Sequence, residues 1–500
     1  MKTIRYWYLV LLLLFTPQAF SQSEYASGED ECTIGVASGK ATSDGRPMVW
    51  KSRDNSGAPD NEVKYNTSFR YKFLSISTVG STYAWMGLNE HGFAIVNALA
   101  SDLPKGTSGP SNGAFMRDAL GSCKTVSEFR HYLDSTNRTG RTTRANLGVI
   151  DSTGEAAIFE TSGDDYQEYN AADAPHGYVV RTNFSMTGGG SSGMERYRRS
   201  QDLMAAFYSG DSLNVKSILR YQMRDFSDAN SRPVPVPYRQ SWAPGIPYGY
   251  INTSKSICRY ATVSAVVIQG VQSGEPGALS TFWAILGQPA AAVVVPYWPV
   301  GPAPSEADGE TTAPLCNVAR QIRTQLFDFS GGSEYINSFK LRDGKGAGLW
   351  SCTFPFEDSL LRIASRFVDS LRILKTVPVA LLQKKEADLA ASALNHLKHC
   401  RLSLLSGVEK HNPEPRITLF LHPASHTLDI RYTLAQSQRV RIELFSLDGR
   451  RVALFYNGIQ HGGRHLLHRQ LPEHCAPGIY LLRVINSQYD ETAKFWVTKK

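Results

Sequence analysis

After its first twenty residues, the sequence lacks any hydrophobic run long enough to cross a membrane. The longest later run, 290–300, contains two prolines, whereas a membrane-spanning helix needs about 20 apolar residues. The chain also lacks a Lys/Arg run or a stripe of basic and aromatic residues, although its formal net charge is +8. We therefore expect no integral membrane segment in the mature protein and no nucleic-acid partner.

Metal and cofactor motifs are also missing. None of the 7 cysteines forms a CxxC pair or has zinc-finger spacing, so we expect no structural metal site. There is no HExxH, GxSxG, Walker or GxGxxG motif. Between Cys32 and Trp350 only His91, His131 and His176 could serve a Ser-His-Asp hydrolase as its base. The sequence therefore favours chemistry that needs neither histidine nor a cofactor.

The N-terminus has the pattern of a secretory signal peptide. Two basic residues precede an apolar run over 7–15, and small residues occupy the −3 and −1 positions of a cleavage site after Ser21. We predict a signal peptide over 1–21 and a short acidic propeptide over 22–31. The mature protein is then secreted into an oxidising compartment, where six of its cysteines could form up to three disulfides.

The body of the chain predicts an α+β fold. With 42% hydrophobic and 20% charged residues, 500 residues can bury several cores. Strand-like runs at 33–37 and 47–51 flank a Gly/Ser/Asp turn and predict a hairpin that begins at Cys32. Helical spacing is concentrated in 113–135, 194–209 and 358–404. We expect helices that cover largely antiparallel sheets.

A polar linker, 409–415, separates this domain (32–408) from a different C-terminal region. In residues 416–500 strand patterns dominate: Val440, Ile442 and Leu444 alternate with charged residues, so one face of that strand is buried. We predict a small all-β, Ig-like sandwich.

Cys32 is the first candidate for a nucleophile. If the peptide bond before it is cut, the freed α-amino group, with a pKa near 8, lies within reach of the thiol and can take its proton. A simpler interpretation is that Cys32 is a buried or disulfide-bonded cysteine.

The residues around Cys32 favour the first interpretation. The Cys-Thr start, the hairpin and the following WKSRD stretch (50–54) resemble the opening of the N-terminal nucleophile (Ntn) hydrolases. Within them the chain is similar to the linear amide C–N hydrolases: choloylglycine hydrolase, penicillin V acylase and the acyl-CoA:6-aminopenicillanate acyltransferase. The resemblance implies that Asp54 holds the Cys32 amine. It also places Lys51 where the group has an arginine, with Arg53 one residue before Asp54, and we assign Lys51 and Arg53 to substrate binding.

Three further stretches resemble this group in the same order. GLNEHGFAIVNA (87–98) places Asn97 in the site, VVRTNF (179–184) makes Asn183 the donor of an amide N–H to the oxyanion, and ERYRRS (195–200) supplies Arg196. Taken singly, Asn97 and Asn183 could be ordinary strand-end hydrogen-bonding residues, and Asp54 could cap a turn. Together the matches imply a four-layer αββα Ntn-hydrolase sandwich.

The C-terminal region resembles the sorting domain of the type IX secretion system of Gram-negative bacteria. The features are a strand, a DGRRV turn (448–452), a GIY strand (478–480) and a basic end. The resemblance implies the secretion machinery as a partner, and a protein that is extracellular or attached to the cell surface. An adhesive sandwich is the alternative.

Together these features predict a secreted cysteine amidohydrolase. Cys32 would attack a small-molecule linear amide, form a thioester acyl-enzyme and pass its proton to the leaving amine, and water would then release the acid. The alternatives are an acyltransferase, a dipeptidase with the same Cys-Thr start, or a catalytically inactive surface-binding protein.

Overall fold

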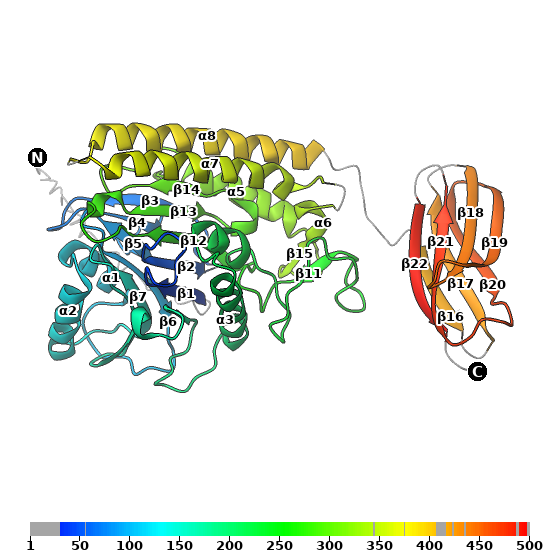
Figure 1. The fold of residues 1–500 in the computed structure, drawn as a ribbon, viewed down its shortest axis with the longest axis horizontal. Coiled ribbons are helices and arrows are strands. Elements are labelled where there is room, and N and C mark those ends of the chain that lie inside the picture. Colours follow the sequence, from blue (N-terminus) through cyan, green and yellow to red (C-terminus); the bar gives the residue numbers. More distant parts are fainter. Residues whose placement is uncertain are drawn as a thin grey trace, which may run out of the picture.

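The computed structural model describes residues 31–55, 57–343, 346–374, 376–406, 417–422, 425–434, 437–486 and 490–497. The predicted signal peptide (1–21), the predicted propeptide apart from Glu31, and the predicted linker (409–415) lie outside the described residues. The rest is a mixture of helices and antiparallel sheets, which confirms the predicted class (Figure 1).

The first sheet contains the hairpin that begins at Cys32. Its strands, in spatial order, are β10 (Tyr178–Arg181), β1 (Cys32–Ala37), β2 (Met48–Asp54), β12 (Thr262–Gln269), β13 (Thr281–Leu286) and β14 (Val295–Tyr297). Every neighbouring pair is antiparallel. The predicted hairpin is confirmed, with Cys32 directly opposite Arg53.

The second sheet is a meander in which each strand pairs with the next one along the chain. Its strands are β3 (Asn61–Asn66), β4 (Phe73–Thr78), β5 (Met86–Asn89), β6 (Ala94–Leu99), β7 (Ala145–Ile150), β8 (Ala156–Thr161) and β9 (Tyr166–Asn170). A small third sheet pairs β11 (Tyr250–Asn252) with β15 (Tyr335–Asn337).

The two large sheets pack face to face. β1 and β2 contact β6 and β7 of the other sheet, and one hydrophobic core joins Ile34 and Val36 to Ile76, Val96 and Ile158. β1 and β2 are buried over their whole length. The second half of β2, residues 51–54, is nevertheless polar or charged, so these side chains are buried beside the start of β1. Gly35 is needed here because a Cβ atom at this position would collide with the indole ring of Trp50, its direct neighbour on β2.

Helices cover both outer faces (Figure 1). On the second sheet lie α1 (Asn112–Ser122) and α2 (Val126–Thr139), which bury Phe115 and Phe129 in a separate core. On the first sheet α5 (Pro314–Leu326) contacts β13, α8 (Val379–Ser406) contacts β14, and α7 (Leu349–Arg372) packs on α8. α3 (Met194–Ser209) contacts β10. The shorter helical elements are η1 (Ala171–Asp173), α4 (Val215–Ser217), η2 (Ile218–Gln222), η3 (Gly277–Leu279), η4 (Pro289–Ala291) and α6 (Ser338–Leu341).

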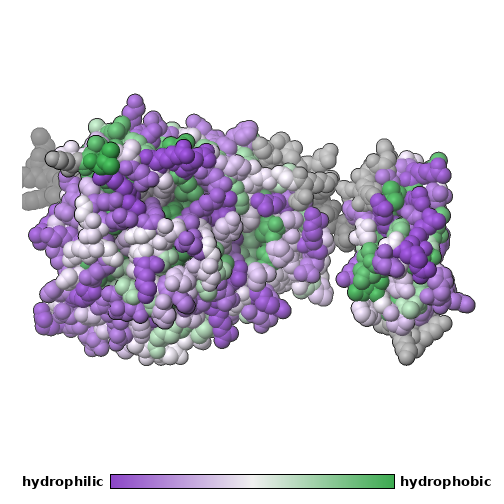
Figure 2. All heavy atoms as spheres, in the orientation of Figure 1, coloured by the Kyte–Doolittle hydropathy of each residue, from purple (hydrophilic) through white to green (hydrophobic). Residues whose placement is uncertain are grey.

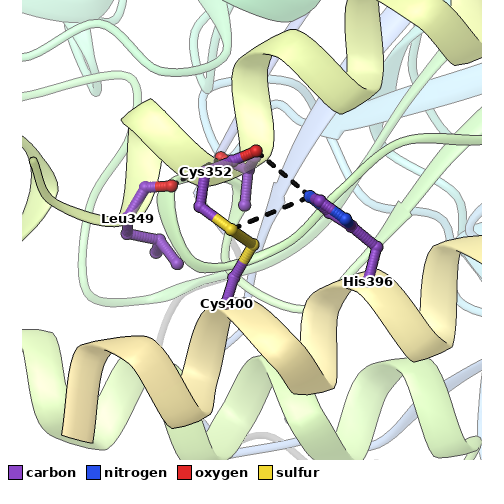
Figure 3. The surroundings of a disulfide bond; sticks show 5 residues. Leu349, Cys352, His396 and Cys400 are labelled. Atoms are coloured by element: carbon purple, nitrogen blue, oxygen red, sulfur yellow. Dashed lines mark hydrogen bonds between the residues drawn. A yellow bond between two sulfur atoms is a disulfide. The ribbon is translucent and has the colours of Figure 1, made fainter. Parts of the chain in front are cut away.

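A disulfide between Cys352 and Cys400 joins the two longest helices, α7 and α8 (Figure 3). The ring of His396 lies beside it, with Nε2 3.1 Å from the Cys352 carbonyl oxygen. The sequence allowed up to three disulfides, but the other five cysteines are not bridged. All five, including Cys32, are buried.

The C-terminal region consists of strands, as predicted. One sheet contains β16 (Ile417–His422), β17 (Thr427–Leu434) and β20 (Gly463–Gln470). The other contains β19 (Arg451–Gln460), β18 (Gln438–Ser446), β21 (Gly478–Ile485) and β22 (Asp490–Val497). Val440, Ile442 and Leu444 are all buried in one core shared by both sheets, so the predicted buried face is confirmed. On the other face Arg439 and Arg441 are exposed, whereas Glu443 is buried.

The surface in Figure 2 is mostly hydrophilic, with an apolar patch at the end of the molecule where α7 and α8 meet. Exposed apolar side chains in that region are Ile373, Leu374, Val379 and Leu381. Within the described ranges no helix is both long and apolar enough to span a bilayer.

Candidate active site

Four of the site residues lie at the same end of neighbouring strands in the first sheet, because these strands run in opposite directions. Cys32 begins β1, Asp54 ends β2 and Asn183 follows the end of β10. Arg259 precedes β12, whose first residue, Thr262, is opposite Asp54. Antiparallel order brings these strand starts and strand ends together.

Both backbone polar groups of Cys32 are held by side chains. Its backbone nitrogen donates a 2.7 Å hydrogen bond to Asn183 Oδ1, and its carbonyl oxygen accepts a 2.6 Å bond from Arg196 Nη1. The Asn183 side chain is oriented in turn, because its Nδ2 donates to the Leu99 carbonyl at 2.9 Å. Cys32 and Asn183 are each 3% exposed, so the hydrogen bond between them is buried.

Arg196 connects several of these groups. Its guanidinium also contacts Thr33 Oγ1 at 3.1 Å, Asn183 Oδ1 at 3.0 Å and the Glu31 carboxylate at 3.1 Å. It lies in the first turn of α3, shortly after Gly193, which has a φ of 75°. A side chain at Gly193 would collide with the Arg196 guanidinium. The helix start is therefore shaped to admit this arginine.

Arg259 is a site residue that the sequence analysis missed. Its Nε lies 3.0 Å from Asp54 Oδ2, and its Nη2 forms an ion pair with the Glu31 carboxylate. Asp54 accepts a second bond, of 2.7 Å, from Thr262 Oγ1. Asp54 follows Arg53, the residue opposite Cys32, and Arg259 and Arg196 are the cations that surround it. The acceptor for the Cys32 nitrogen is Asn183 Oδ1, so the predicted contact of Asp54 with the Cys32 amine stays a prediction.

Burial and charge act against each other in this cluster. Burial raises the pKa of Asp54, although Arg259 and Arg196 partly offset it. Burial also lowers the pKa of Arg196. For Arg259 burial lowers the pKa, but the charges of Asp54 and Glu31 outweigh it and leave the pKa raised. Cys32 contributes to the pKa of both arginines, so the thiol lies within electrostatic reach of two guanidinium groups.

Lys51 and Asn97 form a second group in the space between the sheets. Lys51 Nζ donates to Asn97 Oδ1 at 2.6 Å and to the Trp85 carbonyl at 3.0 Å. Residues directly opposite in an antiparallel pair share a face, so Cys32 and Arg53 point the same way, as does Lys51 two residues earlier. Asn97 thus approaches this face from the other sheet.

Arg53 is fully engaged with the second sheet. Its Nη1 donates to Asn61 Oδ1 at 2.7 Å, its guanidinium contacts Thr78, and it stacks on the Trp85 ring at 4.8 Å. Lys51 and Arg53 are each 1% exposed. Their predicted role in substrate binding stays a prediction.

A cavity of about 360 Å³ opens beside the cluster. It is lined by Glu31, Gly193, Glu195, Arg196, Thr253, Ser254, Lys255, Arg259, Tyr260, Ala261 and Glu334. Lys51 and Arg53 are not among these lining residues. Glu31, the residue before Cys32, therefore lines the cavity. Its carboxylate pairs with Arg196 and Arg259, which line the same cavity.

Among the described residues, one group could share a metal ion: Cys352, His396 and Cys400. Both sulfurs are engaged in the disulfide (Figure 3), and a metal binds cysteine as the thiolate. The group therefore fits a metal only after reduction. The cluster around Cys32 contains two guanidinium groups, Arg196 and Arg259, and the carboxylates of Asp54 and Glu31. Such a cationic cluster suits an anionic ligand better than a metal.

The arrangement can support acyl transfer. Nearby guanidinium groups favour the thiolate form of a cysteine. The side-chain oxygen of Asn183 holds the backbone nitrogen of Cys32, and the buried carboxylate of Asp54 lies next to Arg259. These are the components that a nucleophilic site requires: a thiol, a nitrogen of the same residue that becomes a base if the chain is cut before it, and fixed charges.

Comparison with known families finds a match over part of the chain. Residues 41–246 match the model of the acyl-coenzyme A:6-aminopenicillanic acid acyl-transferase family. This part of the chain is similar to that family. The match includes Asp54, Asn97, Asn183 and Arg196, so the resemblance predicted from the sequence is confirmed there. Cys32 and Arg259 lie outside the matched residues.

Solved structures with a partial likeness have low identity. Penicillin V acylase from Agrobacterium tumefaciens is 18% identical, with a TM-score of 0.32 over 53% of this chain and 85% of that chain. A mutant of the conjugated bile acid hydrolase from Clostridium perfringens is 11% identical, with a TM-score of 0.33 over 51% and 89%. The Caenorhabditis elegans ortholog of N-acylethanolamine-hydrolyzing acid amidase is 13% identical, with a TM-score of 0.30 over 47% and 92%. No curated protein matches the sequence.

Proposed function

We propose that the protein is a secreted cysteine amidohydrolase of the Ntn-hydrolase group, with an αββα catalytic domain, that cleaves a linear amide through a thioester on Cys32. The observation that carries the proposal is the convergence of Asn183, Arg196 and Arg259 on the first residue of β1, with Asp54 paired to Arg259. A strand start is where a chain cut before Cys32 would present its new α-amine.

Two acylations use the same thiol. In processing, Cys32 Sγ attacks the Glu31 carbonyl, the peptide C–N bond breaks, and the nitrogen becomes the Cys32 α-amine. Water then hydrolyses the thioester and releases residues 1–31. In turnover, the α-amine takes the thiol proton and passes it to the leaving amine as Cys32 Sγ bonds to the acyl carbon and the substrate C–N bond breaks. Water then hydrolyses this thioester, which releases the acid and returns the proton to the thiol.

The other residues have separate roles in this proposal. Asn183 Oδ1 holds the Cys32 nitrogen, and its amide N–H stabilises the oxyanion. Asp54 and the two arginines set the charge around the amine and thiol. Lys51 fixes Asn97, which approaches the same face from the second sheet.

Intact mass and a substrate panel test the proposal. The full chain should lose residues 1–31, and the processed protein should cleave amides from a panel of acyl-amides and dipeptides. Cys32→Ala should be inactive, and it should also stay uncut if cleavage is autocatalytic. An active protein that retains Glu31 would contradict the mechanism. A processed, folded protein that cleaves no amide would favour the surface-binding alternative.

An acyltransferase is the second candidate, because the matching family is described as an acyltransferase. The two activities differ in what attacks the thioester. When a substrate is cleaved in the presence of an added amine, a hydrolase releases mainly free acid, whereas an acyltransferase releases mainly the new amide. Product analysis by mass spectrometry separates them.

We also propose that residues 416–500 serve type IX secretion and not catalysis. Their core is formed by their own strands. A chain that ends at residue 408 should keep full turnover in vitro but stay in the periplasm of a type IX-competent host. A large loss of turnover in a folded truncated chain would contradict this assignment.

A further inference from the structure

We propose that Arg196 and Arg259 form a carboxylate-binding subsite for the acyl group, which Glu31 occupies before cleavage and an acidic acyl group of the substrate occupies afterwards. The inference rests on the proposed amidase function and names the substrate class, an amide of a five-carbon dicarboxylic acid, either a glutaryl or a γ-glutamyl amide.

The contacts of Glu31 are the first step. Glu31 Oε2 lies 3.1 Å from Arg196 Nη2 and also pairs with Arg259 Nη2. The Arg196 and Arg259 side chains are only 1% and 15% exposed, whereas Glu31 is 26% exposed. A propeptide carboxylate thus reaches from the cavity side onto two arginines that are built into the domain.

The charge left after processing is the second step. Among the described residues, the carboxylates paired with Arg196 and Arg259 are Glu31 and Asp54. When Glu31 leaves, one carboxylate remains for two buried guanidinium groups. An uncompensated buried charge is costly, so the emptied site favours an anion. Planar guanidinium groups bind carboxylates by paired hydrogen bonds.

The connection to the thiol is the third step. During processing, the Glu31 carbonyl is the acyl carbon that Cys32 attacks, while the Glu31 side chain lies on the arginines. A Glu31 thioester is therefore an acyl-enzyme with its carboxylate in this subsite. Three carbons separate the acyl carbon from the carboxyl carbon in a glutamate residue. A glutaryl group, and a γ-glutamyl group, has the same three-carbon spacing.

The cavity agrees with such a ligand. Its volume of about 360 Å³ holds a small acyl-amide. Lys255 on its wall is already paired with Glu195 at 3.0 Å, which leaves Arg196 and Arg259 as the cations that face the departed Glu31.

The test compares p-nitroanilides of glutaric, succinic, adipic and pentanoic acid on the processed enzyme. We expect kcat/KM for the glutaryl compound to exceed that for the pentanoyl compound by at least about tenfold, the difference that one charge-assisted hydrogen-bonded pair supplies. The kcat/KM values for the succinyl and adipyl compounds should fall between these two. The succinyl chain is one carbon shorter than the glutaryl chain and the adipyl chain is one carbon longer, so neither places its carboxylate correctly on the two arginines. Equal rates for glutaryl and pentanoyl compounds would overturn the subsite and leave the amidase proposal intact.

Arg259→Gln supplies the matched variant. It should lower kcat/KM for the glutaryl compound at least tenfold more than for the pentanoyl compound, and Arg259→Lys should restore part of the preference. The surface variant Arg232→Gln, which removes a cation at an exposed pair with Asp228, should leave the preference unchanged. A preference that survives Arg259→Gln would overturn the assignment.

A binding measurement covers the case in which no anilide is cleaved. That result would contradict the proposed function, but titration of the processed protein with glutarate and with neutral pentanamide still decides the subsite. Glutarate binding that Arg259→Gln removes supports it. Absence of glutarate binding at millimolar concentration, or equal binding of pentanamide, overturns it.

Discussion

Asn183 Oδ1 accepts a 2.7 Å hydrogen bond from the backbone nitrogen of Cys32, which lies 151 residues earlier in the chain. The same oxygen accepts a 3.0 Å bond from Arg196. This orientation of the amide is set by its other end, which donates to the Leu99 carbonyl. The nitrogen that would become the catalytic amine is thus fixed in place before the chain is cut.

The first prediction concerns Asn183. Asn183→Ala should lower kcat about a hundredfold or more with KM nearly unchanged, because an oxyanion donor acts mainly on the transition state. Asn183→Asp should be equally damaging, because it keeps an acceptor for the Cys32 nitrogen but places negative charge near the oxyanion and the Leu99 carbonyl. Steady-state kinetics on the processed variants measures both effects.

Since Asn183 is buried, its removal should also reduce stability, by about 1–3 kcal/mol. Asn89→Ala is a matched control: Asn89 is buried and donates to the carbonyls of Leu120 and Cys123, so it should lower stability without a comparable loss of kcat. If Asn183→Asp retains wild-type kcat, the accepting oxygen alone matters and the oxyanion role is wrong.

The second prediction is a pH dependence at Asp225. Burial raises the pKa of Asp225 to about 6, although Arg199 on α3 lies 2.7 Å away and lowers it. Between about pH 4 and 6 the folded state holds this proton and the unfolded state has lost it, so stability falls as pH rises through that window. Relative to Asp225→Asn, the wild-type protein should lose about 3 kcal/mol across it.

Urea unfolding at several pH values, followed by tryptophan fluorescence, measures this difference. Asp228→Asn is the control. Asp228 is partly exposed; burial raises its pKa, but hydrogen bonds from Arg232 and Asn230 outweigh that and leave the pKa lowered. Its contribution should therefore change only below about pH 4. A wild-type curve parallel to that of Asp225→Asn between about pH 4 and 6 would contradict the assignment.

The sequence predicted the parts of the site that depend on local pattern. The hairpin from Cys32 and the helix that carries Arg196 both follow from turn residues and hydrophobic period. The order of the motifs then placed Asp54, Asn183 and Arg196 with Cys32, and the structure describes these four side by side.

Arg259 and Glu31 could not be predicted in the same way. Arg259 reaches Asp54 only because β12 pairs with β2, a tertiary contact between segments about 200 residues apart for which the local sequence carries no signal. Glu31 belongs to an acidic stretch that we interpreted as disposable. Its contact with two arginines depends on the position of α3 and of the loop before β12.

The third prediction concerns the Cys352–Cys400 disulfide, which closes a loop with a sequence separation of 48. A loop of this length predicts about 4 kcal/mol of stabilisation through the unfolded chain. The double variant Cys352→Ser/Cys400→Ser should melt at a lower temperature and keep its turnover, because α7 and α8 lie on the outer face of the first sheet. Reductant should lower the melting temperature of the wild-type protein to that of the double variant. A melting temperature that neither change affects would contradict this role.

The last prediction uses two glycines that share a backbone conformation. Gly189 and Gly193 have φ values of 74° and 75°, so alanine should cost each about 1–2 kcal/mol from the backbone alone. Their surroundings differ. A Cβ atom at Gly189 meets nothing within 4 Å, whereas at Gly193 it would collide with the Arg196 guanidinium, which holds the Cys32 carbonyl.

Gly193→Ala should therefore lower kcat at least about tenfold beyond Gly189→Ala, because a small displacement of a positioning group is enough for such a loss. Thermal melting of both variants and steady-state kinetics on one substrate measure the comparison. The two should melt within a few degrees of each other, so that a difference in kcat reports the position of Arg196 and not general unfolding. Equal activity in the two folded variants would show that turnover does not depend on where Arg196 lies.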